Sequence, residues 1–157
     1  MNWIKILNKT EKASIEKKLM QQYGIESVEG DLAVRGKDKI FLYSGSLDGE
    51  DLKRLAKAIF IERIGVYFAK EDERMGGIRL SIEGSQILRK QFSKNVFSLN
   101  KSQTEEWMQG RELLIKTGEK GFLIMKNGED FMGTGKASEE KIGNFIPKNR
   151  RLKESLA

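Results

Sequence analysis

Cysteine and histidine are both absent from this chain of 157 residues. No disulfide can therefore hold the fold together, and no zinc or other transition-metal site that depends on sulfur or imidazole ligands can form. Stability has to come from a buried apolar core. The sequence is 38% hydrophobic and 33% charged, a balance typical of globular proteins, and its length suits one ordinary domain or two small ones.

The same absence removes several kinds of catalytic machinery. Thiolate nucleophiles, imidazole bases and serine–histidine triads all need residues that the chain lacks. Carboxylates, lysines, tyrosines and a carboxylate-bound magnesium ion remain as sources of chemistry. The acidic clusters, at 71–73, 129–130 and 139–140, lie in segments typical of turns, where water keeps carboxylates ionised. We therefore expect no catalytic residue, no metal site and no cofactor.

Positive charges outnumber negative ones. Twenty-nine lysines and arginines stand against 23 aspartates and glutamates, a formal net charge of +6. Such a surplus suits a polyanionic partner, although proteins without one share it. No apolar run approaches the roughly 18 to 20 residues of a membrane-spanning helix, and the first ten residues lack the apolar stretch of a signal peptide. The expectation is a cytoplasmic protein without a membrane partner.

Residues 1–93 have the pattern of a compact α+β unit. Apolar residues recur at helical spacing in two segments, each preceded by a polar residue suited to capping, Thr10 in the first and Ser46 or Asp48 in the second. β-branched and aromatic residues form two pairs of strand-like segments separated by turn residues. The expected elements are helices at 10–24 and 52–59, strands at 32–35, 40–44, 64–69 and 78–82, and a helical turn at 86–92.

The pattern changes near residue 93, where we place the boundary between two domains, 1–93 and 94–157. Short apolar segments then follow one another closely and are separated by glycine-containing turns, which favours a small barrel or sandwich. The expected elements are a helix at 103–109 capped by Ser102, and strands at 96–99, 112–116, 121–126, 132–137 and 144–147.

The segment Gly133–Ala137 invites comparison with a phosphate-binding loop because it contains a Gly-Lys pair. Such a loop needs a glycine five residues before that pair and a serine or threonine directly after it, where this chain has Asp130 and Ala137. Glycines that allow close backbone packing in a small β domain explain the segment better.

The clearest binding signal is the segment Asn144–Lys153, in which four cations follow an apolar stretch and the chain's one proline. Like charges at this density repel one another unless a polyanion or nearby acids offset them. The other interpretation is a solvated tail, helped by Glu154. Aromatic residues before and within the segment either stack on bases or belong to the core. They are Trp107, Phe122, Phe131 and Phe145.

Four segments of the second half, in their order along the chain, resemble a PUA domain, the module named for pseudouridine synthases and archaeosine transglycosylases. They are Trp107–Leu113, Gly121–Ile124, Phe131–Lys136 and Asn144–Arg151. The form they resemble most is carried at the C-terminus of RsmF and Sun-type RNA cytosine methyltransferases, especially archaeal ones. Upstream, Gly65–Phe68 and Arg79–Gln86 are similar to the pre-PUA domain that precedes it. The resemblance implies an α+β pre-PUA domain followed by a mostly β, PUA-like pseudobarrel.

PUA domains bind structured RNA, so the resemblance implies an RNA-binding role. It also implies that Gly110 begins a strand at the RNA-facing edge and that Gly133 and Gly135 lie in the glycine-bearing strand of the PUA core. The cations of the last segment would contact phosphates. With the charges that punctuate the preceding strands, the candidate RNA-binding residues are Arg111, Lys116, Lys120, Lys136, Lys148, Arg150, Arg151 and Lys153.

The methyltransferases that the chain resembles carry a Rossmann-like catalytic domain with catalytic cysteines, for which this chain has neither the room nor the residues. We therefore expect non-catalytic binding of rRNA or tRNA, accessory to RNA modification or to ribosome biogenesis and rRNA processing. An RNA methyltransferase or a ribosome-assembly protein is a further expected partner. The alternative is a protein–protein adaptor that docks such an enzyme or assembly factor through the pre-PUA face. A magnesium-dependent enzyme built on an acidic cluster is the remaining interpretation.

Overall fold

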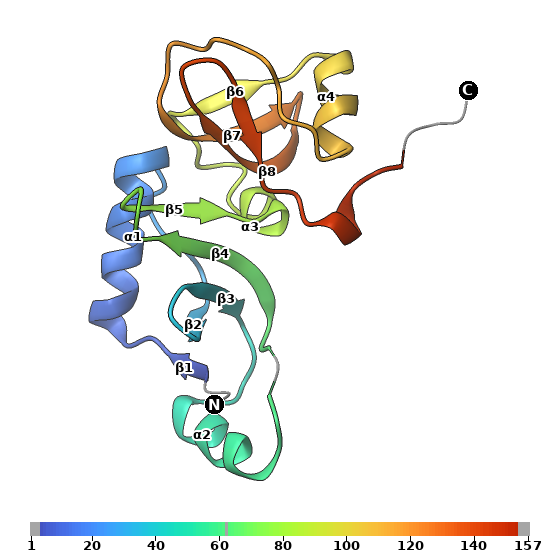
Figure 1. The fold of residues 1–157 in the computed structure, drawn as a ribbon. Helices are drawn as coiled ribbons and strands as arrows, with labels where there is room; N and C mark the ends of the chain where they lie inside the picture. The colour runs from blue at the N-terminus through green and yellow to red at the C-terminus, as the bar shows by residue number, and fades with distance from the viewer. Residues whose placement is uncertain (1–3, 62, 154–157) are drawn as a thin grey trace.

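The computed structural model describes residues 4–61 and 63–153. Within them, two sheets lie one above the other, with the strand orders β1-β2-β3-β4-β5 and β6-β7-β8-β9 (Figure 1). The strands are β1 (Ile4–Ile6), β2 (Asp31–Arg35), β3 (Lys39–Tyr43), β4 (Val66–Asp72), β5 (Gly77–Leu80), β6 (Val96–Ser98), β7 (Gly121–Asn127), β8 (Asp130–Ala137) and β9 (Ile142–Asn144). The helices are α1 (Lys9–Tyr23), α2 (Gly49–Ala58), α3 (Ile82–Ile87) and α4 (Lys101–Met108), with a 3-10 helix at Lys148–Arg150. None of the helices in this part of the chain is long and apolar enough to cross a membrane.

The first helix, α1, is capped by Asn8, two residues before the cap expected at Thr10. The side chain of Asn8 accepts a hydrogen bond from the backbone of Glu11 at 2.8 Å, and the Glu11 carboxylate accepts one from the backbone of Asn8 at 3.1 Å. This reciprocal pair satisfies two backbone donors at once, which a lone threonine does not. Gly24 ends the helix in the left-handed region, at φ 76°, where glycine has no Cβ to clash.

The second predicted helix is confirmed as α2, but its expected apolar stripe is mostly uncovered. Asp48 caps it by accepting a hydrogen bond from the backbone of Asp51 at 2.8 Å. Leu52 is 6% exposed, whereas Leu55 is 39% and Ile59 is 55% exposed. The helix lies at the end of the molecule away from the second sheet (Figure 1). Helical periodicity therefore predicted the helix correctly. The burial that this periodicity implies for the apolar face of the helix is wrong, because most of that face is exposed.

Both hairpins predicted in the first region are formed. β2 and β3 pair antiparallel, and their register places Arg35 opposite Lys39 across the turn. β4 and β5 also pair antiparallel, with Asp72 opposite Gly77. β3 and β4 join the two hairpins in the same sheet, so α1 on one face and four consecutive strands build most of this α+β region.

The second region is mostly strand, as expected, but its sheet is open. Among the described residues, β6 pairs with β7 and β9 pairs with β8, and no ladder joins β6 to β9. The expected pseudobarrel is therefore not closed by hydrogen bonds. The strand expected at 112–116 is reduced to one bridge between Leu113 and Ile142, because Ile115 donates its backbone N–H back to Leu113 at 2.9 Å and turns the chain.

Two helices and the last strand of the chain differ in position from the expectation. α4 is capped by Asn100, which accepts a hydrogen bond from the backbone of Gln103 at 2.8 Å, and not by Ser102. The helical turn expected at 86–92 begins earlier, as α3, because Ser81 caps it. β9 ends at Asn144 and does not start there, because the Asn144 side chain captures the backbone N–H of Ile146 at 2.8 Å. Hydrogen bonds between side chains and the backbone set these boundaries, and the apolar pattern of the sequence does not reveal such bonds.

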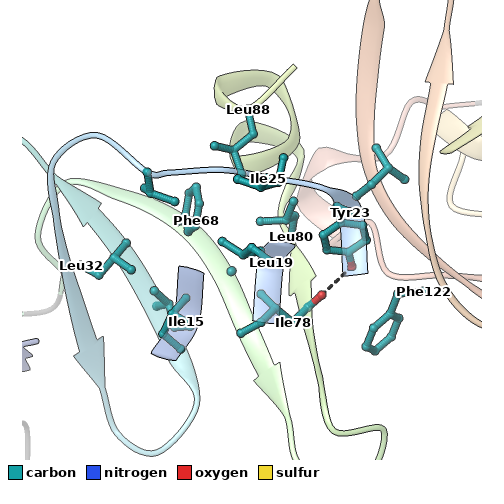
Figure 2. Close-up of a cluster of buried hydrophobic side chains, with 14 of the residues drawn as sticks. Ile15, Leu19, Tyr23, Ile25, Leu32, Phe68, Ile78, Leu80, Leu88 and Phe122 are labelled. Atoms are coloured by element: carbon teal, nitrogen blue, oxygen red, sulfur yellow. Dashed lines mark hydrogen bonds between the residues drawn. The ribbon is translucent and has the colours of Figure 1, made fainter. Parts of the chain in front are cut away.

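One apolar core joins the two regions across the boundary predicted at residue 93. Phe122 of β7 lies beside Ile78 of β5 in a cluster that also contains Tyr23 of α1 (Figure 2). Polar contacts support the same junction: Thr134 of β8 donates its hydroxyl to the carbonyl oxygen of Leu80 at 2.9 Å. The second region is therefore placed rigidly against the first by apolar packing and buried hydrogen bonds.

Tyr23 provides a pH-dependent test of this core. Its hydroxyl donates to the carbonyl oxygen of Ile78 at 2.6 Å (Figure 2), and burial raises the pKa of Tyr23. A raised folded-state pKa of tyrosine stabilises the fold fully below the unfolded value of about 10, and the stabilisation is lost as the pH rises beyond it. We expect the free energy of unfolding of Tyr23→Phe to fall less between about pH 9 and pH 11, by up to about 1.4 kcal/mol per pH unit. Urea denaturation at both pH values measures this change in the free energy of unfolding. Burial also raises the pKa of Tyr67, which is present in both proteins. The measurement therefore compares the slope of the free energy of unfolding against pH in the wild type and in Tyr23→Phe. Equal slopes would contradict the prediction.

Candidate nucleic-acid interface

The basic C-terminal segment is fastened to the second region by backbone hydrogen bonds. Ile146, which is 4% exposed, anchors its start, and Lys148–Arg150 then forms the 3-10 helix. Leu152 donates its backbone N–H to the carbonyl oxygen of Met108 at the end of α4, at 2.8 Å. The segment is therefore held against the domain as far as Leu152. Glu154 and the rest of residues 154–157 lie outside the described residues.

Gly110 leaves room for the side chain of Arg151, which packs against it. A Cβ atom added at Gly110 would lie 2.2 Å from Nε of Arg151, and the glycine has a φ of +84°. The Arg151 guanidinium donates to the carbonyl oxygen of Ile146 at 2.9 Å. The expectation that Gly110 begins a strand is wrong, because its N–H donates to the carbonyl oxygen of Trp107 at 2.9 Å and closes a turn after α4.

Arg150 connects the basic segment to the first region. Its guanidinium forms an ion pair with the carboxylate of Glu83 in α3, and both side chains are only partly exposed. Partial burial strengthens such a pair relative to a fully solvated one. Part of the positive charge of Arg150 is thereby offset within the molecule, whereas Lys148 and Lys153 on the same segment are exposed.

The remaining candidate cations lie near the start of β7 and the end of β8. Lys136 is exposed near the end of that strand, opposite Gly143 of β9. Lys120 is exposed directly before β7, whose first residue pairs with Ala137. Lys116 lies 3.8 Å from the carboxylate of Glu140, with both side chains about three-quarters exposed, a separation at which an ion pair contributes little.

Arg111 lies near the basic C-terminal segment, because it directly follows Gly110, against which Arg151 packs. The Asn144 side-chain amide donates to the backbone carbonyl oxygen of Arg111 at 3.0 Å and to that of Trp107 at 2.9 Å. The eight candidate residues therefore fall into one group around Gly110 and the C-terminal segment and another around the start of β7 and the end of β8. Their contact with RNA stays a prediction.

Three of the four aromatic candidates are core residues and do not present a face for base stacking. Trp107 is fully buried and Phe122 and Phe131 are each 7% exposed. Phe145 is half-buried, and the Arg79 guanidinium carbon lies 4.0 Å from the centre of its ring. Stacking on bases is therefore wrong for the first three, and the cation of Arg79 already occupies one face of the fourth.

A small cavity of about 130 Å³ lies at the junction of the two regions, beside the basic segment. Arg79 and Glu83 of the first region line it together with Phe145 and Arg150 of the second. Sequence reasoning missed Arg79 and Glu83 as parts of the site. Arg79 could have been found from the sequence, because it is a cation between the apolar residues Ile78 and Leu80, both of which are buried. Side chains alternate along a strand, so Arg79 projects from the opposite face of the sheet.

The glycine segment of β8 supports packing and offers no phosphate-binding loop. Gly133 and Gly135 both lie inside this antiparallel strand, which no helix follows directly, whereas a phosphate-binding loop leads into a helix N-terminus. A Cβ atom added at Gly135 would lie 2.6 Å from Cγ2 of Ile142 and 2.9 Å from Cη2 of Trp107. In the part of the chain that the structure describes, no group of three or more acidic, histidine or cysteine residues could hold a metal ion.

We expect Gly135→Ala to lower the free energy of unfolding by about 1–3 kcal/mol, because a methyl group forced into a packed core displaces its neighbours. Gly49→Ala is the matched control, since an added Cβ atom there meets nothing within 4 Å. Chemical denaturation of both variants measures the difference. Equal stability of the two variants would contradict the close packing of β8 against Trp107.

Comparison with known families gives this region a class. Residues 94–152 match the family model of the methyltransferase RsmF PUA domain. No curated protein matches the chain. This part of the chain is therefore similar to the PUA domain found in the C-terminal region of RsmF-type methyltransferases. The match begins within the segment that links α3 to β6 and ends within the basic segment, so it includes all the candidate RNA-binding residues except Lys153.

Proposed function

We propose that this protein binds structured RNA, either rRNA or tRNA, through residues 94–157 and catalyses no reaction itself. The observation that carries the proposal is the match of residues 94–152 to a PUA domain, a module whose class binds structured RNA. Residues 1–93 then serve as a pre-PUA-like domain that supports it. We further propose an accessory role in RNA modification or ribosome biogenesis in the cytoplasm, with an RNA methyltransferase or an assembly protein as partner.

The chemistry of the candidate residues suits a phosphate backbone. Lysine and arginine neutralise phosphates and release condensed counterions, which supplies affinity without reading sequence. A-form RNA is recognised largely by its shape and backbone, because side chains cannot reach into its deep, narrow groove. The bonds that hold Arg151 and Leu152 against the domain fix the cations before RNA arrives, which lowers the entropy lost on binding.

Crosslinking in cells tests the proposal. The tagged protein is crosslinked to RNA with ultraviolet light, purified under denaturing conditions, and the attached RNA is sequenced. The expected result is enrichment of rRNA or tRNA fragments over a tagged control protein of similar charge. Recovery no greater than that of the control would contradict RNA binding.

A protein–protein adaptor is the second candidate function, and one observation favours it. Apolar side chains of α2 and the residues flanking it are open to solvent, with Phe60 71% and Leu47 42% exposed, and exposed apolar clusters of this kind often mark protein contacts. An adaptor that docks an RNA methyltransferase or an assembly factor keeps its partner after nuclease treatment. Affinity purification with and without nuclease separates the two functions, since partners held only through RNA are lost.

A further inference from the structure

Four cations form a continuous row across four strands of the first sheet. The register pairs Arg35 of β2 with Lys39 of β3, Lys39 with Lys70 of β4, and Lys70 with Arg79 of β5. Directly paired residues project from the same face of a sheet, with Cβ atoms about 4.5–5.5 Å apart. These four residues are named the cationic row below.

The cationic row lies on the face of the sheet opposite α1. Ile40 and Leu80, which neighbour the row in their strands, are buried in the apolar core together with the α1 residues Leu19 and Tyr23. Because side chains alternate along a strand, the row points away from that core. The row lines a groove of about 570 Å³, whose other lining residues are Phe41, Arg63 and Tyr67.

Like charges in directly opposed positions destabilise a sheet, so the row needs a compensating anion. The carboxylate of Asp38 lies 3.5 Å from the ammonium nitrogen of Lys70, and among residues 4–61 and 63–153 no carboxylate lines the groove itself. The acidic residues that the structure describes therefore form an ion pair with one cation of the row, Lys70, and leave a surplus of positive charge among the described residues of the groove.

The cationic row leads toward the PUA domain. Tyr67 and Arg79 line both the groove and the junction cavity that Arg150 borders. The Arg79 guanidinium, at the end of the row, also lies over the ring of Phe145 in the second region. A chain of positive side chains thus runs from β2 to the basic C-terminal segment.

We propose that the cationic row holds the phosphodiester backbone of the same RNA that the PUA domain binds. With neighbouring strands about 4.8 Å apart, the row is about 14 Å long, which suits several phosphates in line better than one small anion. The proposal rests on the proposed function and extends it: RNA is held by both regions. The first region then sets the direction in which the RNA leaves the PUA domain.

The test compares matched double variants of the full-length chain in binding to a structured rRNA or tRNA fragment. Arg35→Gln with Lys39→Gln removes the half of the row farthest from the PUA domain. Lys9→Gln with Lys17→Gln removes the same charge from exposed positions on α1, on the opposite face. A third variant, Lys148→Gln with Lys153→Gln, reports on the PUA domain.

The row variant is expected to bind RNA about tenfold more weakly than the α1 control, with a salt slope lower by about 1.5 log units, because two phosphate contacts are lost. Its melting temperature without RNA should be equal or higher, since repulsion is relieved. If the row variant and the control bind equally while the PUA variant is weakened, the row proposal is wrong and RNA binding by the PUA domain stands. If the wild-type chain binds no RNA, both are wrong.

Discussion

Replacing Trp107 with alanine is expected to lower the free energy of unfolding by about 3–5 kcal/mol, the largest loss of any single substitution considered for this chain. The indole is fully buried, and its Nε1–H donates to the carbonyl oxygen of Met132 at 3.1 Å. Truncation leaves a cavity between α4 and β8 and an unpaired carbonyl group. Because native domains are stable by only about 5–15 kcal/mol, such a loss removes a large part of the stability, and urea denaturation measures it.

Two controls separate the contributions of packing and hydrogen bonding at Trp107. Trp107→Phe keeps most of the ring volume but loses the donor, so its loss of stability should lie between those of the wild type and Trp107→Ala. Leu114→Ala removes an apolar side chain that is 85% exposed and should change stability by less than about 0.5 kcal/mol. A Trp107→Ala variant as stable as Leu114→Ala would contradict the packing of the second region described above.

Removing four exposed lysines of the PUA domain is expected to weaken RNA binding about 100-fold, because each lost phosphate contact forgoes the release of a counterion. The four substitutions are Lys120→Gln, Lys136→Gln, Lys148→Gln and Lys153→Gln. None of the four forms an ion pair with another residue in the part of the chain that the structure describes, so the fold should not suffer. Fluorescence anisotropy with a labelled tRNA or rRNA fragment measures the affinity.

The control for this variant removes the same charge elsewhere on the chain. It carries Lys9→Gln, Lys17→Gln, Lys57→Gln and Lys90→Gln, all at exposed positions outside residues 94–157. Both variants have the same net charge, so a loss of affinity confined to the first assigns the effect to position. Equal losses in the two would show that RNA is attracted by the overall charge, and the assignment of the candidate residues would fall.

Local pattern in the sequence predicted the elements well. The hairpin at β2 and β3, the helix α2 and the strands β7 and β8 each carry a short-range signal, such as alternation, a cap or an Asn-Gly turn. Boundaries were less accurate where a polar side chain decided them, as at Asn8 and Asn100. Each asparagine completes a capping box with a residue three positions later, and an apolar pattern does not reveal this pairing.

The candidate site could be predicted only in part, because it depends on contacts between distant segments. The ion pair of Arg150 with Glu83 joins residues 67 positions apart, and the cationic row draws one residue from each of four strands. The charge of Lys148–Lys153 was visible as a run in the sequence, whereas the row appears only once strand register is known. The buried state of Trp107, Phe122 and Phe131 likewise follows from packing and not from their spacing.

The salt dependence of RNA binding by the intact wild-type chain tests the central proposal most directly. The dissociation constant for a structured rRNA or tRNA fragment is measured over a series of potassium chloride concentrations. If the PUA domain neutralises several phosphates, binding is saturable and its affinity falls steeply, by about 0.7–0.9 log units per log unit of salt for each phosphate, hence about 3 or more in total. Absence of saturable binding, or an affinity that does not change with salt, would contradict it.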